Sequence, residues 1–179
     1  MRLCVFGGAS DVAEYLELGE ALGRAMARRG WGLVFGGGGH GLMGAAARGV
    51  QAGGGEIIGV APRFFQRPGV LFDGCTEFIF TETMAQRKTR MEELADAFLA
   101  LPGGVGTLEE FFEVLTLRQL GRHEKPIAVL DRAGYYRPLE DLVEHSVRAG
   151  FTPASTRALY GVFADPEECL RYLEEGLSL

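Results

Sequence analysis

The chain has 179 residues, of which 47% are hydrophobic and 23% charged, and its formal net charge is -6. This acidic balance excludes non-specific binding to nucleic acid, which needs a basic surface, although backbone dipoles on an acidic protein can still bind a small anion. No apolar stretch is long enough to span a membrane and the N-terminus enters a strand at once, so we expect a cytoplasmic protein without a signal peptide.

Strands and helices are expected to alternate along the chain. Short apolar runs predict strands at residues 3–6, 31–35, 56–61, 76–80, 97–101 and 126–130. Helical spacing predicts helices from a cap at Ser10 or Asp11 to residue 29, and then at residues 42–52, 83–96, 107–120, 136–149 and 166–175. Residues 62–74 show no clear period and are expected to be irregular.

Strands that are near-continuous apolar runs and alternate with helices are typical of a parallel sheet covered on both faces. We therefore expect an α/β fold with a single doubly wound, Rossmann-like parallel sheet, as one nucleotide-binding domain over residues 1–179. In such sheets the ligand binds outside the carboxyl ends of the strands. Glycine-rich turns follow three strands, at residues 7–8, 36–39 and 103–106, and we expect them to converge on one crevice.

The third turn carries the most specific pattern. Residues 102–110 read Pro-Gly-Gly-Val-Gly-Thr-Leu-Glu-Glu directly after the apolar run at 97–101. A strand that enters a glycine loop and then a helix points several backbone N–H groups at one spot, which the helix dipole makes favourable for a phosphate. Glu110 lies about one helical turn inside, where its carboxylate can face the ligand. The alternative is a purely structural glycine turn.

The second turn consists of four consecutive glycines followed by His40. Such a run costs backbone entropy on folding, so its bare backbone is expected to serve a ligand, with Gly37 and Gly38 as candidates. The pattern resembles a dinucleotide fingerprint, but the acidic residue expected about 20 residues later is absent, because residues 56–61 end apolar. A mononucleotide therefore fits better than NAD. The first turn, taken alone, is a weak signal.

A basic cluster occupies residues 84–91, which read Met-Ala-Gln-Arg-Lys-Thr-Arg-Met. Arg87 and Arg90 are neighbours on the predicted helix, and Met84, Lys88 and Met91 share a face. The helix begins at the binding side of the sheet, where a guanidinium can hold a phosphate or a ribose hydroxyl. The alternative is a solvated helical face.

The histidines and cysteines have no metal-ligand spacing. His40 lies where it can touch a ligand, whereas His123 and His145 are expected at the surface. The three cysteines are far apart and odd in number, so we expect buried thiols in a reducing compartment and no disulfide framework.

These residues resemble the Lonely Guy (LOG) family, the cytokinin riboside 5′-monophosphate phosphoribohydrolases formerly labelled lysine decarboxylase-like. The family motif Pro-Gly-Gly-x-Gly-Thr-x-x-Glu matches residues 102–110, and its Met-x-x-Arg-Lys-x-x-Met element matches residues 84–91. The similarity covers most of the chain. Residues 62–82 follow the plant-type pattern less closely, which leaves the preferred base open.

The resemblance implies that Arg87 and Glu110 form the catalytic pair, and it implies a homodimer or higher oligomer with the site near the subunit interface. With the glycine loops, the expected substrate-binding residues are Gly37, Gly38, Met84, Lys88, Gly103, Gly104, Val105, Gly106, Thr107, Leu108 and Glu109. No metal and no other cofactor is expected. A decarboxylase usually needs pyridoxal phosphate on a lysine, and no residue pattern identifies such a lysine.

The implied reaction is hydrolysis of the N-glycosidic bond of a nucleoside 5′-monophosphate, AMP or an N6-modified AMP, to free base and ribose 5-phosphate. The alternative is a non-catalytic carrier of a nucleotide or of molybdenum cofactor, as found among related Rossmann-like proteins. The Arg87 and Glu110 pair separates the two, because a carrier need not keep it. A purely structural protein is disfavoured by the entropic cost of the glycine runs.

Overall fold

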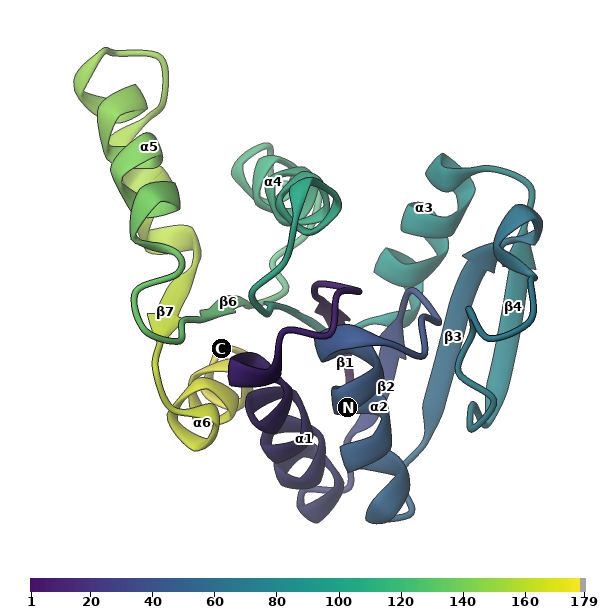
Figure 1. The fold of residues 1–179 in the computed structure, drawn as a ribbon. Helices are drawn as coiled ribbons and strands as arrows, with labels where there is room; N and C mark the ends of the chain where they lie inside the picture. The colour runs from purple at the N-terminus through teal and green to yellow at the C-terminus, as the bar shows by residue number, and fades with distance from the viewer. Residues whose placement is uncertain (178–179) are drawn as a thin grey trace.

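The computed structural model describes residues 1–177, whose strands form one parallel sheet (Figure 1). The strands are β1 (Arg2–Phe6), β2 (Gly32–Phe35), β3 (Ile57–Pro62), β4 (Glu77–Thr81), β5 (Ala97–Ala100), β6 (Ile127–Leu130) and β7 (Gly161–Phe163). Their order across the sheet is β4-β3-β2-β1-β5-β6-β7, and every neighbouring pair is parallel. This confirms the predicted parallel α/β fold.

Helices cover both faces of the sheet. They are α1 (Ala13–Arg28), α2 (Gly41–Ala52), α3 (Met84–Leu94), α4 (Val105–Gln119), α5 (Arg137–Arg148) and α6 (Pro166–Leu177), with short 3₁₀ turns at Arg63–Phe65 and Ala154–Leu159. In Figure 1, α1, α2 and α6 lie on one side of the sheet and α3, α4 and α5 on the other. The sheet is therefore doubly wound, as predicted. None of the described helices combines the length and the hydropathy needed to cross a membrane.

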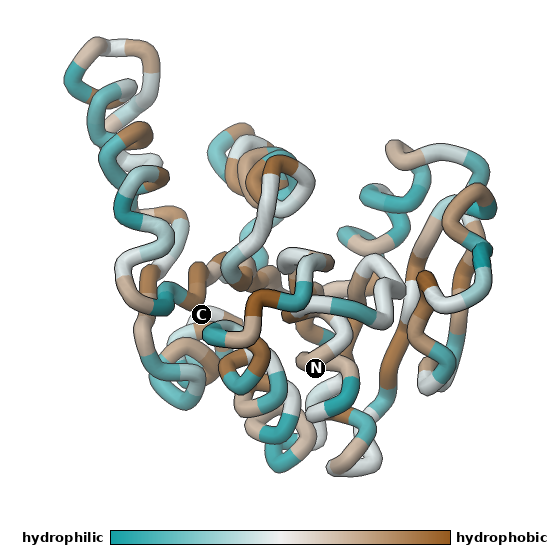
Figure 2. The backbone as a smooth tube through the Cα atoms, viewed as in Figure 1, coloured by the Kyte–Doolittle hydropathy of each residue, from teal (hydrophilic) through white to brown (hydrophobic). Residues whose placement is uncertain are grey.

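The central strands contribute to two cores because successive side chains point to opposite faces. In β1, Leu3 and Val5 join the cluster that includes α1, α2 and α6. Cys4 and Phe6 join the second cluster, under α3 and α4. The sheet is thus buried on both faces, which explains why its strands read as continuous apolar runs. Figure 2 shows the same pattern, with apolar colour in the central strands and alternating colour along the helices.

Two elements near the C-terminus were not predicted. β7 has only three residues and begins with a glycine, and the 3₁₀ turn at Ala154–Leu159 precedes it. A strand this short carries no usable periodicity, and it forms because it pairs with the edge of β6. All the predicted strands and helices are present, with ends that match or are shifted by up to three residues.

The predicted cap of the first helix is wrong. The N-cap residue of α1 is Val12, and no side chain caps this helix. Asp11 Oδ1 instead accepts a hydrogen bond of 2.8 Å from the backbone N–H of Gly41, the first residue of α2. The Asp11 side chain therefore binds the start of α2, which is distant in sequence, and does not cap its own helix.

The sheet changes direction at β1. From β1 the chain builds β2, β3 and β4 outward on one side, and it then returns to build β5, β6 and β7 on the other. The carboxyl ends of β1 and β5 therefore flank a topological switch point, the place where open α/β sheets bind ligands.

Candidate active site

A cavity of about 930 Å³ opens at this switch point. All three predicted glycine turns contribute to its wall, through Gly7 and Gly8, through Gly36 and Gly38, and through Gly103, Gly104 and Gly106. Their convergence is confirmed. The remaining lining residues come from the segment 9–15, from His40 to Met43, from the rim at 65–71, and from Arg87, Pro102, Thr107, Glu110 and Tyr135.

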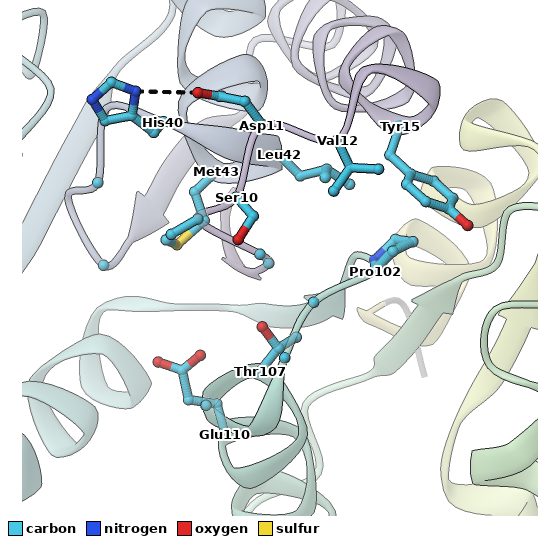
Figure 3. A pocket seen from close by; sticks show the side chains of 18 of the residues that line it. Ser10, Asp11, Val12, Tyr15, His40, Leu42, Met43, Pro102, Thr107 and Glu110 are labelled. Atoms are coloured by element: carbon cyan, nitrogen blue, oxygen red, sulfur yellow. Dashed lines mark ion pairs between the residues drawn. The ribbon is translucent and has the colours of Figure 1, made fainter.

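At the bottom of the cavity Arg87 from α3 meets Glu110 from α4. Arg87 Nη2 lies 2.8 Å from Glu110 Oε1, and the two residues are only 8% and 7% exposed. A charge buried this deeply needs a partner, and each of the two supplies the other's. Figure 3 shows the Glu110 carboxylate projecting from the first turns of α4 into the cavity.

Gly36 makes room for this ion pair. A Cβ atom at Gly36 would lie 2.1 Å from Arg87 Nη2, which is far inside van der Waals contact. The guanidinium therefore occupies the space that a side chain at the end of β2 would fill, and its Nε donates to the carbonyl oxygen of Val60 at 3.2 Å. The second glycine loop thus provides, at Gly36, the space for the guanidinium of Arg87, which lies far along the chain.

The Glu110 carboxyl has a perturbed pKa. Burial raises its pKa above the ordinary value, the Arg87 charge opposes that shift, and the charge of Glu109 adds to it. Among the described residues Oε1 lies 2.8 Å from Arg87 Nη2 as an ion pair and has no other hydrogen-bond partner. A buried carboxylate oxygen without a hydrogen-bond donor can accept a hydrogen bond from a ligand hydroxyl or from a water molecule.

The N-terminus of α4 is open. Its N-cap is Gly104, and no side chain caps the helix. The first backbone N–H groups of a helix have no partner within it, and the helix dipole makes them favourable for an anion. We call the N–H groups of Gly104, Val105, Gly106 and Thr107 the α4 amide end. Ser10 and Thr107 lie on opposite walls of the cavity beside it (Figure 3).

In contrast to that of α4, the N-terminus of α2 is already bound by a carboxylate of the protein. The Asp11 carboxylate accepts from Gly41 N and also lies 3.5 Å from His40 Nδ1, the contact drawn in Figure 3. His40 Nε2 in turn contacts the carbonyl oxygen of Gly69 at 2.9 Å. Three loops are thereby tied together at the rim of the cavity, around a negative charge.

The structure places the predicted site residues in two groups. Those that line the cavity are Gly38, Arg87, Gly103, Gly104, Gly106, Thr107 and Glu110. Those outside its lining are Gly37, Met84, Lys88, Val105, Leu108 and Glu109. Lys88 contacts Glu109 and lies 2.8 Å from Glu113, so its ammonium joins α3 to α4 beside the Arg87 and Glu110 pair.

Several lining residues were not predicted from the sequence. Phe65, Val70 and Leu71 come from the irregular segment, a candidate lining of the base pocket whose aperiodic pattern does not identify these residues individually. Tyr15 and Tyr135 meet edge to face at 5.9 Å at another part of the wall.

His123 is not the surface residue that was expected. It is half-buried, its Nε2 lies 3.0 Å from the carbonyl oxygen of Val114, and its ring packs against Phe98. Burial lowers its pKa. Over residues 1–177 no group of three or more His, Cys, Asp or Glu side chains is arranged to hold a metal ion.

Comparisons with known proteins connect this site to a family. Residues 43–173 match the family model described as "Possible lysine decarboxylase". A cytokinin riboside 5′-monophosphate phosphoribohydrolase of Rhodococcoides fascians is 47% identical over 155 residues, which cover 86% of this chain and 78% of that protein. The Arabidopsis thaliana phosphoribohydrolase LOG7 is 39% identical, with 97% of this chain and 81% of that protein covered.

Solved structures with the same fold include molybdenum cofactor proteins. The molybdenum cofactor binding protein of Rippkaea orientalis superposes with a TM-score of 0.75 at 22% identity, covering 97% of this chain and 95% of that one. The molybdenum cofactor carrier protein of Chlamydomonas reinhardtii superposes with a TM-score of 0.74 at 25% identity, covering 99% and 98%.

Proposed function

We propose that this chain, which belongs to the Lonely Guy family, is a nucleoside 5′-monophosphate phosphoribohydrolase like its named relatives. It hydrolyses the N-glycosidic bond of AMP or an N6-modified AMP and releases the free base and ribose 5-phosphate. The observation that carries this proposal is the buried ion pair of Arg87 and Glu110 beside the open α4 amide end.

The phosphate is proposed to bind at the α4 amide end, where unpaired N–H groups and the helix dipole favour an anion. Glu110 lies on the same helix, about one turn further along, so a nucleotide held by its phosphate presents its sugar to this carboxylate. Binding energy from the phosphate then serves to orient the reacting carbon. Nucleosides, which lack the phosphate, are expected to be poor substrates.

The reaction balances with water as the only co-reactant. The bond between C1′ and the base nitrogen breaks, its electron pair leaves with the base, and the sugar develops the positive charge of an oxocarbenium ion. The Glu110 carboxylate stabilises that charge and orients a water molecule, whose oxygen bonds to C1′. The proton that water loses balances the proton that the departing base takes up. Arg87 keeps Glu110 ionised and fixes its direction.

Seven of the other predicted site residues take one of two proposed roles, the second of them together with Glu113. Gly38, Gly103, Gly104, Gly106 and Thr107 form the wall against which the nucleotide lies. Lys88, Glu109 and Glu113 join α3 to α4 and keep Arg87 opposite Glu110. We therefore propose that Lys88 supports nucleotide binding from outside the cavity.

The proposal includes a cytoplasmic homodimer. Exposed apolar side chains stand at the two ends of α4 and on α5, with Val105 84%, Leu120 63% and Leu142 57% exposed. Exposed apolar side chains such as these are available for an interface between subunits. The three free cysteines are typical of a reducing compartment. Analytical ultracentrifugation of the purified chain tests the dimer.

The test of the proposed function is base release from AMP by the wild type and by Glu110→Gln. The variant keeps the shape of the side chain and loses its charge, so AMP binding is retained while kcat falls by about 10²–10⁴-fold. The wild-type rate should decline as the pH falls, and the decline should begin above the pH at which an exposed glutamate loses its charge, because burial raises the pKa of Glu110.

Two outcomes contradict this proposal. Equal turnover by Glu110→Gln removes this residue from catalysis. Wild-type protein that binds AMP or molybdenum cofactor and releases no base from any nucleoside monophosphate is a carrier, the function named for the Chlamydomonas reinhardtii structural neighbour. A panel that contains AMP, N6-modified AMP and the other nucleoside monophosphates also identifies the preferred base.

A further inference from the structure

The connection between β5 and α4 is held by two consecutive tyrosines from a distant segment. Tyr136 Oη donates to the carbonyl oxygen of Leu101 at 2.5 Å, and Tyr135 Oη donates to that of Gly103 at 2.5 Å. Between them, the carbonyl oxygen of Pro102 accepts from Gly8 N at 3.0 Å. Three successive carbonyl groups of the loop are therefore bound by donors.

These hydrogen bonds determine the direction in which the peptide groups of the loop point. A carbonyl oxygen that turned toward a bound anion would repel it, whereas an N–H group attracts it. Because the carbonyls of residues 101–103 are engaged elsewhere, the peptide groups that follow them are held in the orientation that leads into the α4 amide end. The loop contains Gly103 and Gly104, whose backbones have wide freedom, so external bonds are needed to select one conformation.

The two tyrosines are themselves held in place. Asp131 Oδ1 accepts from Tyr136 N at 3.0 Å, and the turn between them puts Ala133 at φ 57° and Gly134 at φ 76°. A left-handed alanine costs about 1–2 kcal/mol, so the surrounding contacts enforce this turn. Tyr136 is 1% exposed, and its ring meets the Tyr135 ring edge to face at 5.1 Å.

The two side chains differ in their access to the cavity. Tyr135 lines it and is 40% exposed, whereas Tyr136 is buried beneath the loop. Burial raises the pKa of Tyr136 far above its ordinary value, so its hydroxyl stays protonated and remains a donor. Tyr135 is therefore the member that can be altered with the smaller effect on folding.

We propose that Tyr135 and Tyr136 are positioning residues for phosphate recognition, because they hold the carbonyl groups of Leu101 and Gly103 away from the α4 amide end. The inference rests on the proposed phosphate site. It assigns to Tyr135 a role in discriminating nucleotides from nucleosides without direct participation in the cleavage step.

The test compares Tyr135→Phe with the wild type, and with Tyr172→Phe as the matched loss of one hydroxyl on α6. Base release from AMP and from adenosine gives KM and kcat, and inhibition of AMP cleavage by inorganic phosphate reports on the anion site alone. Loss of the Tyr135 hydrogen bond should raise KM for AMP by about 5- to 10-fold and weaken phosphate inhibition equally, with kcat nearly unchanged. Cleavage of adenosine should not change, so the preference for AMP over adenosine falls by the same factor.

A purely structural role for Tyr135 would lower activity on both substrates alike. The inference is overturned if Tyr135→Phe keeps the wild-type preference for AMP and the wild-type inhibition by phosphate. If Tyr136→Phe folds, it should show the same loss of preference for AMP. If Tyr136→Phe does not fold, the result for Tyr135→Phe alone tests the inference.

Failure of the proposed function gives a different result. If the wild type binds AMP but releases no base, the affinities of Tyr135→Phe for AMP and for inorganic phosphate, measured by calorimetry, still test the inference. If the wild type binds neither, both proposals are contradicted.

Discussion

Two glycine loops in this chain each lead from a strand into a helix, and they end in opposite electrostatic states. The loop after β2 enters α2, whose first N–H group at Gly41 is already bound by the Asp11 carboxylate. The loop after β5 enters α4, whose N-cap Gly104 receives no side-chain cap. The same sequence signature thus produces one helix N-terminus that is occupied by a negative charge and one that is open.

The glycines of the two loops also differ in what surrounds them. Gly36 gives its side-chain space to the Arg87 guanidinium, and Gly37 has a φ of 76° close to the Phe78 ring. At Gly104 and Gly106 no protein atom lies within 4 Å of the position of a Cβ, so packing within the chain does not require glycine at either position. A glycine run is therefore not in itself a phosphate site. Its function depends on whether the N-terminus of the next helix is free or already bound by another group of the protein.

The largest expected effect comes from Gly36→Ala, which adds a methyl group to the loop that is proposed not to hold the phosphate. The new Cβ would meet Arg87 Nη2 at the far end of a long side chain, so the backbone is retained while the guanidinium is displaced from Glu110. Displacement of a catalytic group by about 1 Å can cost about 100-fold in rate. We expect kcat for AMP to fall by that order, and the thermal unfolding midpoint to fall as well, because two buried charges lose their partner.

Gly36→Ala should leave the preference for AMP over adenosine unchanged, because the α4 amide end is intact. A change confined to KM for AMP would place the phosphate at the loop after β2 and would reverse the comparison.

A smaller effect is expected from Gly106→Ala at the open end of α4. In a helix, alanine is favoured over glycine, so the free energy of unfolding should rise by about 0.5 kcal/mol. The added methyl group stands in the cavity wall where the anion approaches, and KM for AMP should rise by about 10-fold. Denaturant unfolding and steady-state kinetics on the same preparation test both parts. A more stable protein with unaltered KM would show that no ligand comes near this glycine.

The smallest effect is expected from Asp11→Asn. The amide oxygen still accepts from Gly41 N, so α2 keeps its N-terminal partner, and only the exposed charge is lost. A surface charge contributes little, so affinity for AMP should change by less than about threefold. If the phosphate instead binds at α2, removal of this carboxylate should strengthen AMP binding by an order of magnitude or more. Isothermal titration with AMP on a Glu110→Gln background distinguishes the two results without turnover.

The sequence predicted those features that depend on local pattern and on general rules for parallel sheets. Continuous apolar strands and helical spacing led to the doubly wound fold, and the rule that ligands bind at strand carboxyl ends brought the three glycine turns together. β7 escaped prediction because three residues carry no period, and its place is fixed only by pairing with β6.

The site was predicted less completely because its key contacts join distant segments. The local sequence pattern does not indicate that Arg87 fills the space beside Gly36. Nor does it indicate that Asp11 accepts a hydrogen bond from α2 and leaves α1 uncapped. The family resemblance supplied the pairing of Arg87 with Glu110, and the structure places the two in contact. The resemblance did not predict where the Lys88 ammonium lies. The helical face of Lys88 followed from the sequence, but its partners Glu109 and Glu113 lie on another helix.

The most direct test of the central claim is a crystal structure of Glu110→Gln in complex with AMP. We expect phosphate oxygens within hydrogen-bonding distance of the N–H groups of residues 104–107, with C1′ of the ribose facing residue 110. A phosphate bound near Asp11 and Gly41, or a ribose turned away from residue 110, would contradict the claim.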